Sequence, residues 1–179
     1  MTAVPAIVNN ARLDLVASNP LGHALFAPVY ASPRSPANQT ANHARFTFLD
    51  PRARDFWTDW ERAADDSVAQ LRTEAGRDPY DQALTRLVGE LSTRSEAFRT
   101  RWAAHNVRLH RTGRKHFHHP VVGDMHLNFE VMELPADPGL SLLAFSADAG
   151  SRDDDALHLL ASWAATHDPA DALKSATQT

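Results

Sequence analysis

The amino-acid sequence predicts an α+β fold with one antiparallel sheet and helices packed on it. Between residues 50 and 102, apolar residues recur at steps of three and four, which is the period of a helix. After Gly113 apolar residues alternate with polar ones, which is the period of a strand. The order along the chain is therefore two strands, several helices, three strands and a last helix.

The first 42 residues predict two short strands, one helix and a loop. Residues 6–8 and 13–17 are strand-like, with a turn at residues 9–11 between them. Asn19-Pro20 is typical of a helix N-cap with proline at the first helical position, and this helix ends before Pro28. Residues 28–42 are rich in proline, serine, alanine and asparagine, so they predict a surface loop.

Three helices are predicted next. The first runs from the cap-and-proline pair Asp50-Pro51 to Gly76 and has a long apolar stripe. The second covers residues 78–91, and the third begins with Ser95 as its N-cap. Because the connections are short, we expect the three helices to pack on one another.

The C-terminal part predicts three strands and one helix. A strand from Lys115 and a strand ending at Leu134 are joined by a turn at residues 122–125, and a third strand covers residues 140–147. Residues 150–163 predict the last helix. We expect one domain over residues 5–165, followed by a flexible C-terminal tail over residues 166–179.

Composition excludes several classes of protein. The chain has 179 residues and a formal net charge of −4, which is the wrong sign for a protein whose whole surface follows nucleic acid. It contains no cysteine, so thiolate metal sites and cysteine nucleophiles are excluded. Neither an apolar run of about 18 residues nor a signal-peptide pattern is present, so we expect a cytoplasmic protein without membrane contact.

Histidines are concentrated in one segment, because five of the ten lie between residues 105 and 119. With Gly123 and Asp124 as the turn, His118 faces Phe129 on the apolar side of the hairpin. His119 and His126 then lie on the opposite side, and no three histidines converge. Structural or hydrogen-bonding roles are favoured, ahead of proton or anion binding and of a metal site.

Residues 97–123 contain six basic residues and no acidic residue. In one interpretation these side chains pair with the acidic helix that carries Glu61, Asp65 and Asp66. In the other they form an anion site, in which arginine binds a carboxylate or phosphate with two hydrogen bonds. A face for duplex DNA is disfavoured, since the segment has no recognition-helix pattern.

Large aromatic residues recur on the predicted helices, at positions such as Trp57, Trp60, Phe98 and Trp102. Such stripes are typical of a core, and next to an antiparallel sheet they also line apolar pockets. Nucleophilic-serine, phosphate-binding glycine and His-Glu-x-x-His motifs are absent from the sequence. We therefore predict no catalytic residue, no metal and no cofactor, and we do not expect an enzyme.

Several short sequence segments, called phrases below, resemble in sequence and in order the MmyB-like transcription regulator ligand-binding domain, a family common in actinobacterial regulators. The resemblance spans about residues 5–165 and uses separate phrases along the chain. The phrases are LDLVASNPLGHALFAP at 13–28, FTFLDPRARDFWTDWE at 46–61, VAQLR at 68–72, LVGELS at 87–92, residues 98–107, HPVVGD at 119–124 and ALHLLA at 156–161.

This resemblance implies a PAS-like domain, with an antiparallel sheet and helices around a pocket that senses a small molecule. Fatty-acid-like ligands are the suggested class, and the usual neighbour is an N-terminal helix-turn-helix domain of the XRE type. This chain begins almost where the sensor begins, so we expect it to lack that DNA-binding domain. A homodimer is expected, because such regulators commonly contact two half-sites.

A fatty-acid-like ligand needs an apolar channel and an anchor for its headgroup. From their chemistry, we expect the apolar contacts to come from six residues and the headgroup contacts from four cationic or hydrogen-bonding residues. The apolar set is Trp57, Trp60, Phe98, Trp102, Leu127 and Phe129, and the headgroup set is Arg45, His105, Arg108 and His119.

Two other functions stay open at this point. One is a protein-interaction or dimerisation module without ligand, for which a small, fully packed cavity would be typical. The other is a small histidine-dependent metalloenzyme, which requires histidine side chains that converge on one point.

Overall fold

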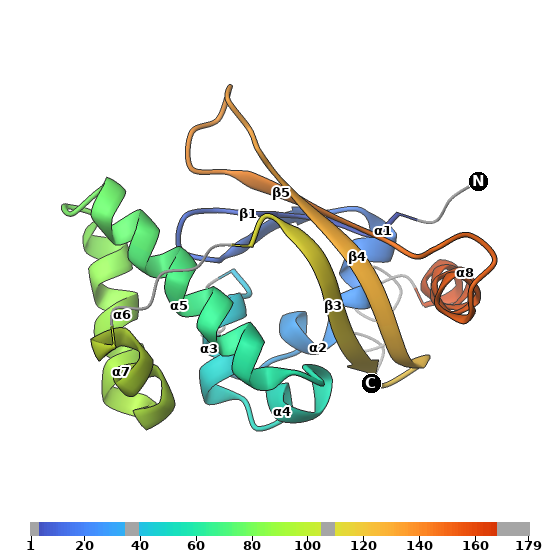
Figure 1. Ribbon diagram of the computed structural model, residues 1–179, viewed down its shortest axis with the longest axis horizontal. Coiled ribbons are helices and arrows are strands. Elements are labelled where there is room, and N and C mark those ends of the chain that lie inside the picture. Colours follow the sequence, from blue (N-terminus) through green and yellow to red (C-terminus); the bar gives the residue numbers. More distant parts are fainter. Residues whose placement is uncertain (1–3, 35–39, 105–109, 168–179) are drawn as a thin grey trace, which may run out of the picture.

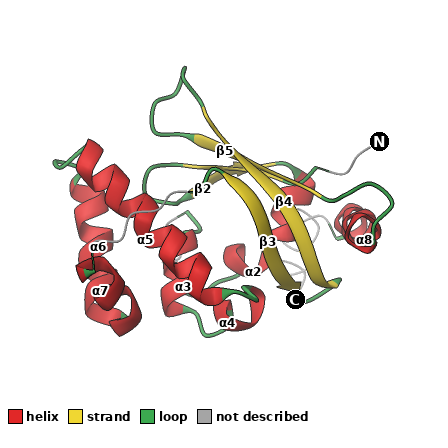
Figure 2. Ribbon diagram, in the orientation of Figure 1, coloured by secondary structure: helices red, strands yellow, loops and turns green. Residues whose placement is uncertain are grey.

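Alternating apolar residues build a five-stranded antiparallel sheet in the computed structural model, which describes residues 4–34, 40–104 and 110–167 (Figures 1 and 2). The order across the sheet is β2-β1-β5-β4-β3, and the predicted α+β class is confirmed. A PAS-like arrangement is consistent with it. The strands are β1 (Ala6–Asn9), β2 (Leu15–Ser18), β3 (Thr112–His119), β4 (Gly123–Glu133) and β5 (Ser141–Ser146).

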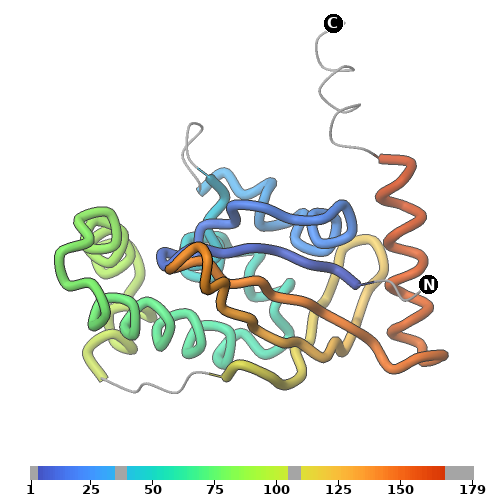
Figure 3. The backbone as a smooth tube through the Cα atoms, turned by 90° about the horizontal axis from the view of Figure 1, so that it is seen from above, coloured from blue at the N-terminus to red at the C-terminus, as the bar shows by residue number. Residues whose placement is uncertain are grey.

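The helices lie on one side of the sheet and at its end (Figures 1 and 3). Helix α8 packs against α1, while α6 and α7 pack on each other and on α5. The helices are α1 (Pro20–Leu25), α2 (Ala27–Tyr30), α3 (His43–Leu49), α4 (Ala53–Phe56), α5 (Trp60–Arg77), α6 (Gln82–Arg94), α7 (Glu96–Ala103) and α8 (Arg152–Thr166).

Burial alternates along the strands, so the sheet has an inner and an outer face. Phe117, Leu127 and Phe145 point inward and are buried, whereas His118 and His126 point outward and are exposed. The inward residues form the main core with α1 to α5 and α8. A second core between α5, α6 and α7 contains Val68, Leu71, Leu84, Leu87, Leu91 and Phe98, with α3 and Leu13 at its border.

Two predicted helix N-caps are confirmed. The side chains of Asn19 and Ser95 accept hydrogen bonds from the first turns of α1 and α7, and Ser151 caps α8 in the same way. The predicted loop at residues 28–42 is partly wrong, because α2 occupies its start. The tail beyond residue 167 lies outside the described residues.

The single long helix predicted over residues 50–76 is wrong, because the chain forms α4 and α5 with a break between them. At the break, Trp57 forms a backbone bridge with Phe117 of β3, and the Thr58 N–H donates to the His116 carbonyl at 3.3 Å. The Asp59 side chain then caps α5. The backbone contact with β3 therefore interrupts the helix that the spacing of apolar residues predicts over residues 50–76.

The predicted register of the β3–β4 hairpin is also wrong. Pro120 lies in the turn, where its missing N–H costs no sheet hydrogen bond, and Gly123 at the end of the turn has a φ of 76°. His119 pairs with Gly123 and His118 with Asp124, so the two histidines exchange faces relative to the prediction. His119 points inward and His118 outward.

The contact between α1 and β1 gives a testable prediction. A Cβ atom at Gly22 would lie 2.1 Å from the carbonyl oxygen of Ala6, so Gly22→Ala must displace the helix from the strand. We expect this change to lower the free energy of unfolding by about 3 kcal/mol in urea titrations. The control is Gly89→Ala in α6, where no atom lies within 4 Å, and which we expect to stabilise by about 1 kcal/mol. Equal stability of the two variants would contradict the close packing.

Candidate functional site

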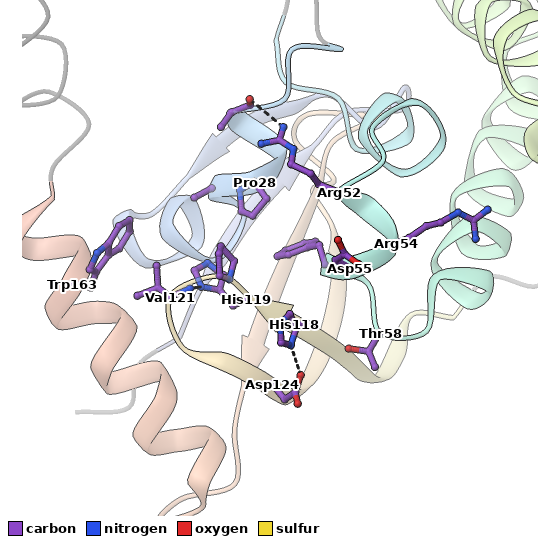
Figure 4. Close-up of a pocket in the computed structure, with 14 residues that line it drawn as sticks. Pro28, Arg52, Arg54, Asp55, Thr58, His118, His119, Val121, Asp124 and Trp163 are labelled. Carbon is purple, nitrogen blue, oxygen red and sulfur yellow. Dashed lines mark hydrogen bonds and ion pairs between the residues drawn. The ribbon is translucent and has the colours of Figure 1, made fainter.

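A pocket of about 880 Å³ opens where α2, α4, the β3–β4 turn and α8 meet (Figure 4). Most of its wall is apolar, and Trp163 and Val121 lie beside each other on one side of it in Figure 4. Its lining residues are Ala27, Pro28, Ala31, Arg52, Arg54, Asp55, Phe56, Thr58, His118, His119, Pro120, Val121, Asp124 and Trp163.

The break between α4 and α5 positions one wall of this pocket. Because the chain leaves the helical path at Trp57, α4 stays short and lies next to β3. Its residue Phe56 is buried and packs against the rings of Phe117 and His119. The wall therefore depends on the same backbone bridge that ends α4.

Arg52 is held at the pocket by a buried carboxylate. Asp50 accepts hydrogen bonds from Arg52 Nε at 3.0 Å, from Arg52 Nη2 at 2.7 Å and from the Ser32 hydroxyl at 2.6 Å. Burial raises the pKa of Asp50, but the hydrogen bonds from Arg52 and Ser32 outweigh it and lower the pKa from its ordinary 3.8 to about 2. Arg52 Nη2 also donates to the Ala31 carbonyl. The remaining nitrogen, Nη1, makes no hydrogen bond to any described residue.

His119 is the one residue of the predicted headgroup set that lines this pocket, among those that the structure describes. The Val121 N–H donates to its Nδ1 at 3.2 Å, so Nε2 carries the ring proton and donates to the Ala24 carbonyl at 3.0 Å. Burial lowers the pKa of His119, which keeps the ring neutral at pH 7. Both nitrogens are engaged, and His119 therefore serves as part of the wall.

His118 contributes a polar group from the outer side of β3. Its Nδ1 lies 2.6 Å from Asp124 Oδ1, and both side chains are about half exposed. The hydrogen bond from His118 lowers the pKa of Asp124. Nε2 of His118 makes no hydrogen bond to a described residue, so it is available to a ligand.

Of the other predicted headgroup residues, the structure describes only Arg45, which does not line this pocket. Arg45 is held by Glu90 through two contacts of 2.9 Å and borders a separate surface groove. His105 and Arg108 lie outside the described residues.

The predicted apolar set is divided between the two cores. Trp57, Trp60, Leu127 and Phe129 lie in the main core, whereas Phe98 and Trp102 pack in or against the second. Sequence reasoning missed Arg52, Phe56, Val121 and Trp163. The phrases at 46–61 and 119–124 contain three of these residues, but only the tertiary contacts show that they meet.

Most of the basic side chains in residues 97–123 form ion pairs with acidic residues. Arg101 contacts Glu61 and Asp65 of α5, and Lys115 lies 3.8 Å from Asp66, as the pairing interpretation predicts. Arg111 and Arg114 pair instead with Glu133 and Asp148. Arg54, which lies outside the segment, has no acidic partner within the described ranges, and its guanidinium carbon lies 3.9 Å from the Trp60 ring centroid. Free positive charge is therefore found near the pocket.

The histidines of the hairpin do not form a metal centre. His116 and His126 form a cross-strand pair with ring centroids 3.4 Å apart. Burial lowers the pKa of His116, and the neighbouring His126 adds to this effect. Within residues 4–34, 40–104 and 110–167, no group of three or more His, Asp or Glu side chains could hold a metal ion.

The Asp50–Arg52 pair predicts a pH-dependent stability. Since the pKa of Asp50 is lower in the native state, its stabilisation is complete above about pH 4 and is lost as the pH falls towards 2. We expect Asp50→Asn to cost about 2 kcal/mol of unfolding free energy at pH 7 and less below pH 4, in urea titrations at each pH. The exposed Asp55→Asn serves as the control with little effect. A cost that is constant from pH 7 to pH 2.5 would contradict this assignment.

Residues 1–160 of the chain match the family described as the MmyB-like transcription regulator ligand binding domain. Among curated proteins no match was found. In the part of the chain that the structure describes, every helix is too short or too polar to cross a membrane. The match covers most of the 179 residues and confirms the resemblance of the sequence phrases. The chain thus belongs to the family of MmyB-like transcription regulator ligand binding domains.

Proposed function

We propose that this chain senses a fatty-acid-like molecule for a bacterial transcription regulator, and that the pocket between α4 and Trp163 is the binding site. One observation carries the proposal: a pocket of about 880 Å³ combines apolar walls with an arginine that a buried carboxylate holds in place. Small-molecule sites commonly have volumes of about 300–1,000 Å³ and this mixture of surfaces.

The apolar part of the ligand would lie against Phe56, Val121 and Trp163. A second groove of about 640 Å³ follows α1 and α8, and it shares Ala27 and Trp163 with the first pocket. Because the two share these residues, we infer that an acyl chain would run from one into the other. Each buried methylene group contributes about 0.8 kcal/mol, so affinity should rise with chain length until the path is filled.

The carboxylate of the ligand would accept hydrogen bonds from Arg52 Nη1. This assignment replaces Arg45, which borders a different groove, and His119, whose two ring nitrogens are both engaged. His105 and Arg108 remain sequence predictions.

Helix α8 is suited to transmit the bound state. It contributes Trp163 to the pocket, and its buried residues Leu157 and Leu160 pack in the main core. A ligand that binds one position of α8 more tightly shifts the population of the domain towards that position. DNA binding would belong to a helix-turn-helix domain outside these residues, in a cytoplasmic homodimer. The role is binding, not catalysis.

An interaction module without ligand is the second candidate. The specific observation in its favour is that the two grooves adjoin along α8, so a peptide segment of a partner protein could occupy them. The metalloenzyme is not proposed, because the described histidines do not converge.

Native mass spectrometry followed by denaturing lipid extraction distinguishes these candidates. We expect an acyl species at about one per chain, or an increase in melting temperature with fatty acids of 10 to 18 carbons if the purified protein is empty. A protein that is empty and whose melting temperature no fatty acid changes would contradict the sensor function and support the interaction module.

A substitution that fills the pocket tests its location. Val121 is 40% exposed in the turn, so Val121→Trp should fold normally and place an indole beside Trp163. We expect at least tenfold weaker binding of a fatty acid in fluorescence titrations. Val16→Trp is the matched control, because Val16 is 44% exposed on β2 and lines none of these pockets. Equal weakening by both variants, or by neither, would exclude this pocket as the site.

A further inference from the structure

The pocket and the groove along α8 have two lining residues in common, Ala27 of α2 and Trp163 of α8. A ligand that runs from one into the other would therefore pass beside these two side chains. One of them is a single methyl group and the other is an indole, and both are half-buried. We call the space beside them the passage.

The Trp163 side of the passage is fixed by the end of α8. The His167 ring stacks on the Trp163 indole with centroids 4.7 Å apart and an interplanar angle of 16°. His167 Nδ1 lies 3.0 Å from the Trp163 carbonyl oxygen and 2.9 Å from the Thr166 hydroxyl, which orients the imidazole. Trp163 also packs against the main core. An aromatic ring with these contacts forms a wall of fixed position.

The Ala27 side of the passage is fixed by the main core. Phe26, the preceding residue, is 1% exposed and contacts the rings of Phe117 and Phe145. The Ala31 N–H donates to the Ala27 carbonyl at 2.9 Å, which holds Ala27 in α2. Because close-packed cores resist displacement, the passage cannot widen freely for a broader ligand.

Beyond the passage, the groove runs between α1 and α8, which pack against each other. Its apolar wall consists largely of single methyl groups from the two helices. They belong to Ala24, Ala161, Ala164 and Ala165. Methyl groups that face each other across a groove suit a slender chain of methylene groups.

We propose that Ala27 and Trp163 determine which acyl chains the site accepts, so that long unbranched chains pass between them and methyl-branched chains do not. This selectivity rests on the proposed function, because it concerns the same pocket. A branch widens the chain, and extra methyl groups in a passage of fixed width require displacement of the packed side chains. Each methylene group that passes into the groove adds to the apolar surface removed from water.

Isothermal titration calorimetry with octanoate and hexadecanoate tests the role of Ala27. Ala27→Leu places an isobutyl group in the passage, and we expect at least tenfold weaker binding of hexadecanoate. Exclusion of two methylene groups is enough to lower the affinity by about tenfold. Binding of octanoate should stay unchanged, because a short chain anchored at Arg52 ends before the passage.

Ala156→Leu is the matched control for Ala27→Leu. Ala156 is a half-buried alanine of α8 that lines neither the pocket nor the groove. We expect this variant to bind octanoate and hexadecanoate as the natural chain does.

The role of Trp163 is tested with phytanic acid, whose main chain is that of hexadecanoate with methyl branches. We expect the natural chain to bind hexadecanoate at least tenfold more tightly than phytanic acid. Trp163→Ala opens the passage, so this preference should fall below threefold. The ratio of the two affinities separates the width of the passage from the apolar contact that both ligands lose.

The comparison of hexadecanoate with phytanic acid needs no variant, so the proposal stays testable if Ala27→Leu fails to fold. Equal binding of the two by the natural chain would overturn the proposal, as would undiminished binding of hexadecanoate by folded Ala27→Leu. Either result leaves the sensor function in place. If the natural chain binds neither octanoate nor hexadecanoate, the sensor function fails and the selectivity fails with it.

Discussion

The backbone bridge between Trp57 and Phe117 connects the helical layer to the edge of the sheet. The Trp57 indole is buried, donates to the Thr47 hydroxyl at 3.2 Å and stacks on His43. The bridge covers part of the exposed edge of β3, which would otherwise offer free N–H and carbonyl groups to another chain. It also ends α4 and directs α5 away, so both the pocket wall and the position of α5 under the sheet depend on it.

Charge in this domain is arranged by pairing across elements. The acidic side chains of α5 neutralise Arg101 and partly neutralise Lys115. Exposed pairs of this kind contribute little stability individually, but they remove positive charge from the segment in which the sequence concentrates it. Arg52, which is oriented by Asp50, and Arg54, which has no acidic partner among the described residues, are the two arginines that line the apolar pocket. The position of an anion site is therefore set by which arginines the fold brings to the pocket.

The pocket at Trp163 is wide and mainly apolar, so removal of apolar surface from water would supply most of its binding free energy. Strand β3 contributes His118 and His119 to this pocket, and its inward-facing residue Phe117 lies in the main core. A change in the position of β3 would therefore affect both the pocket and the core.

The sequence by itself determined the α+β class, the order of most elements and two helix caps, because periodicity and capping are local properties of a few neighbouring residues. The tertiary structure alone decided the break at Trp57 and the register that turns His119 inward, since both depend on hydrogen bonds between segments far apart in the chain. It also decided which predicted residues meet. The large aromatic residues Trp57, Trp60 and Phe98 are buried in the two cores, and Arg45 forms an ion pair with Glu90. The pocket is lined instead by residues from four separate segments, whose proximity no local pattern encodes.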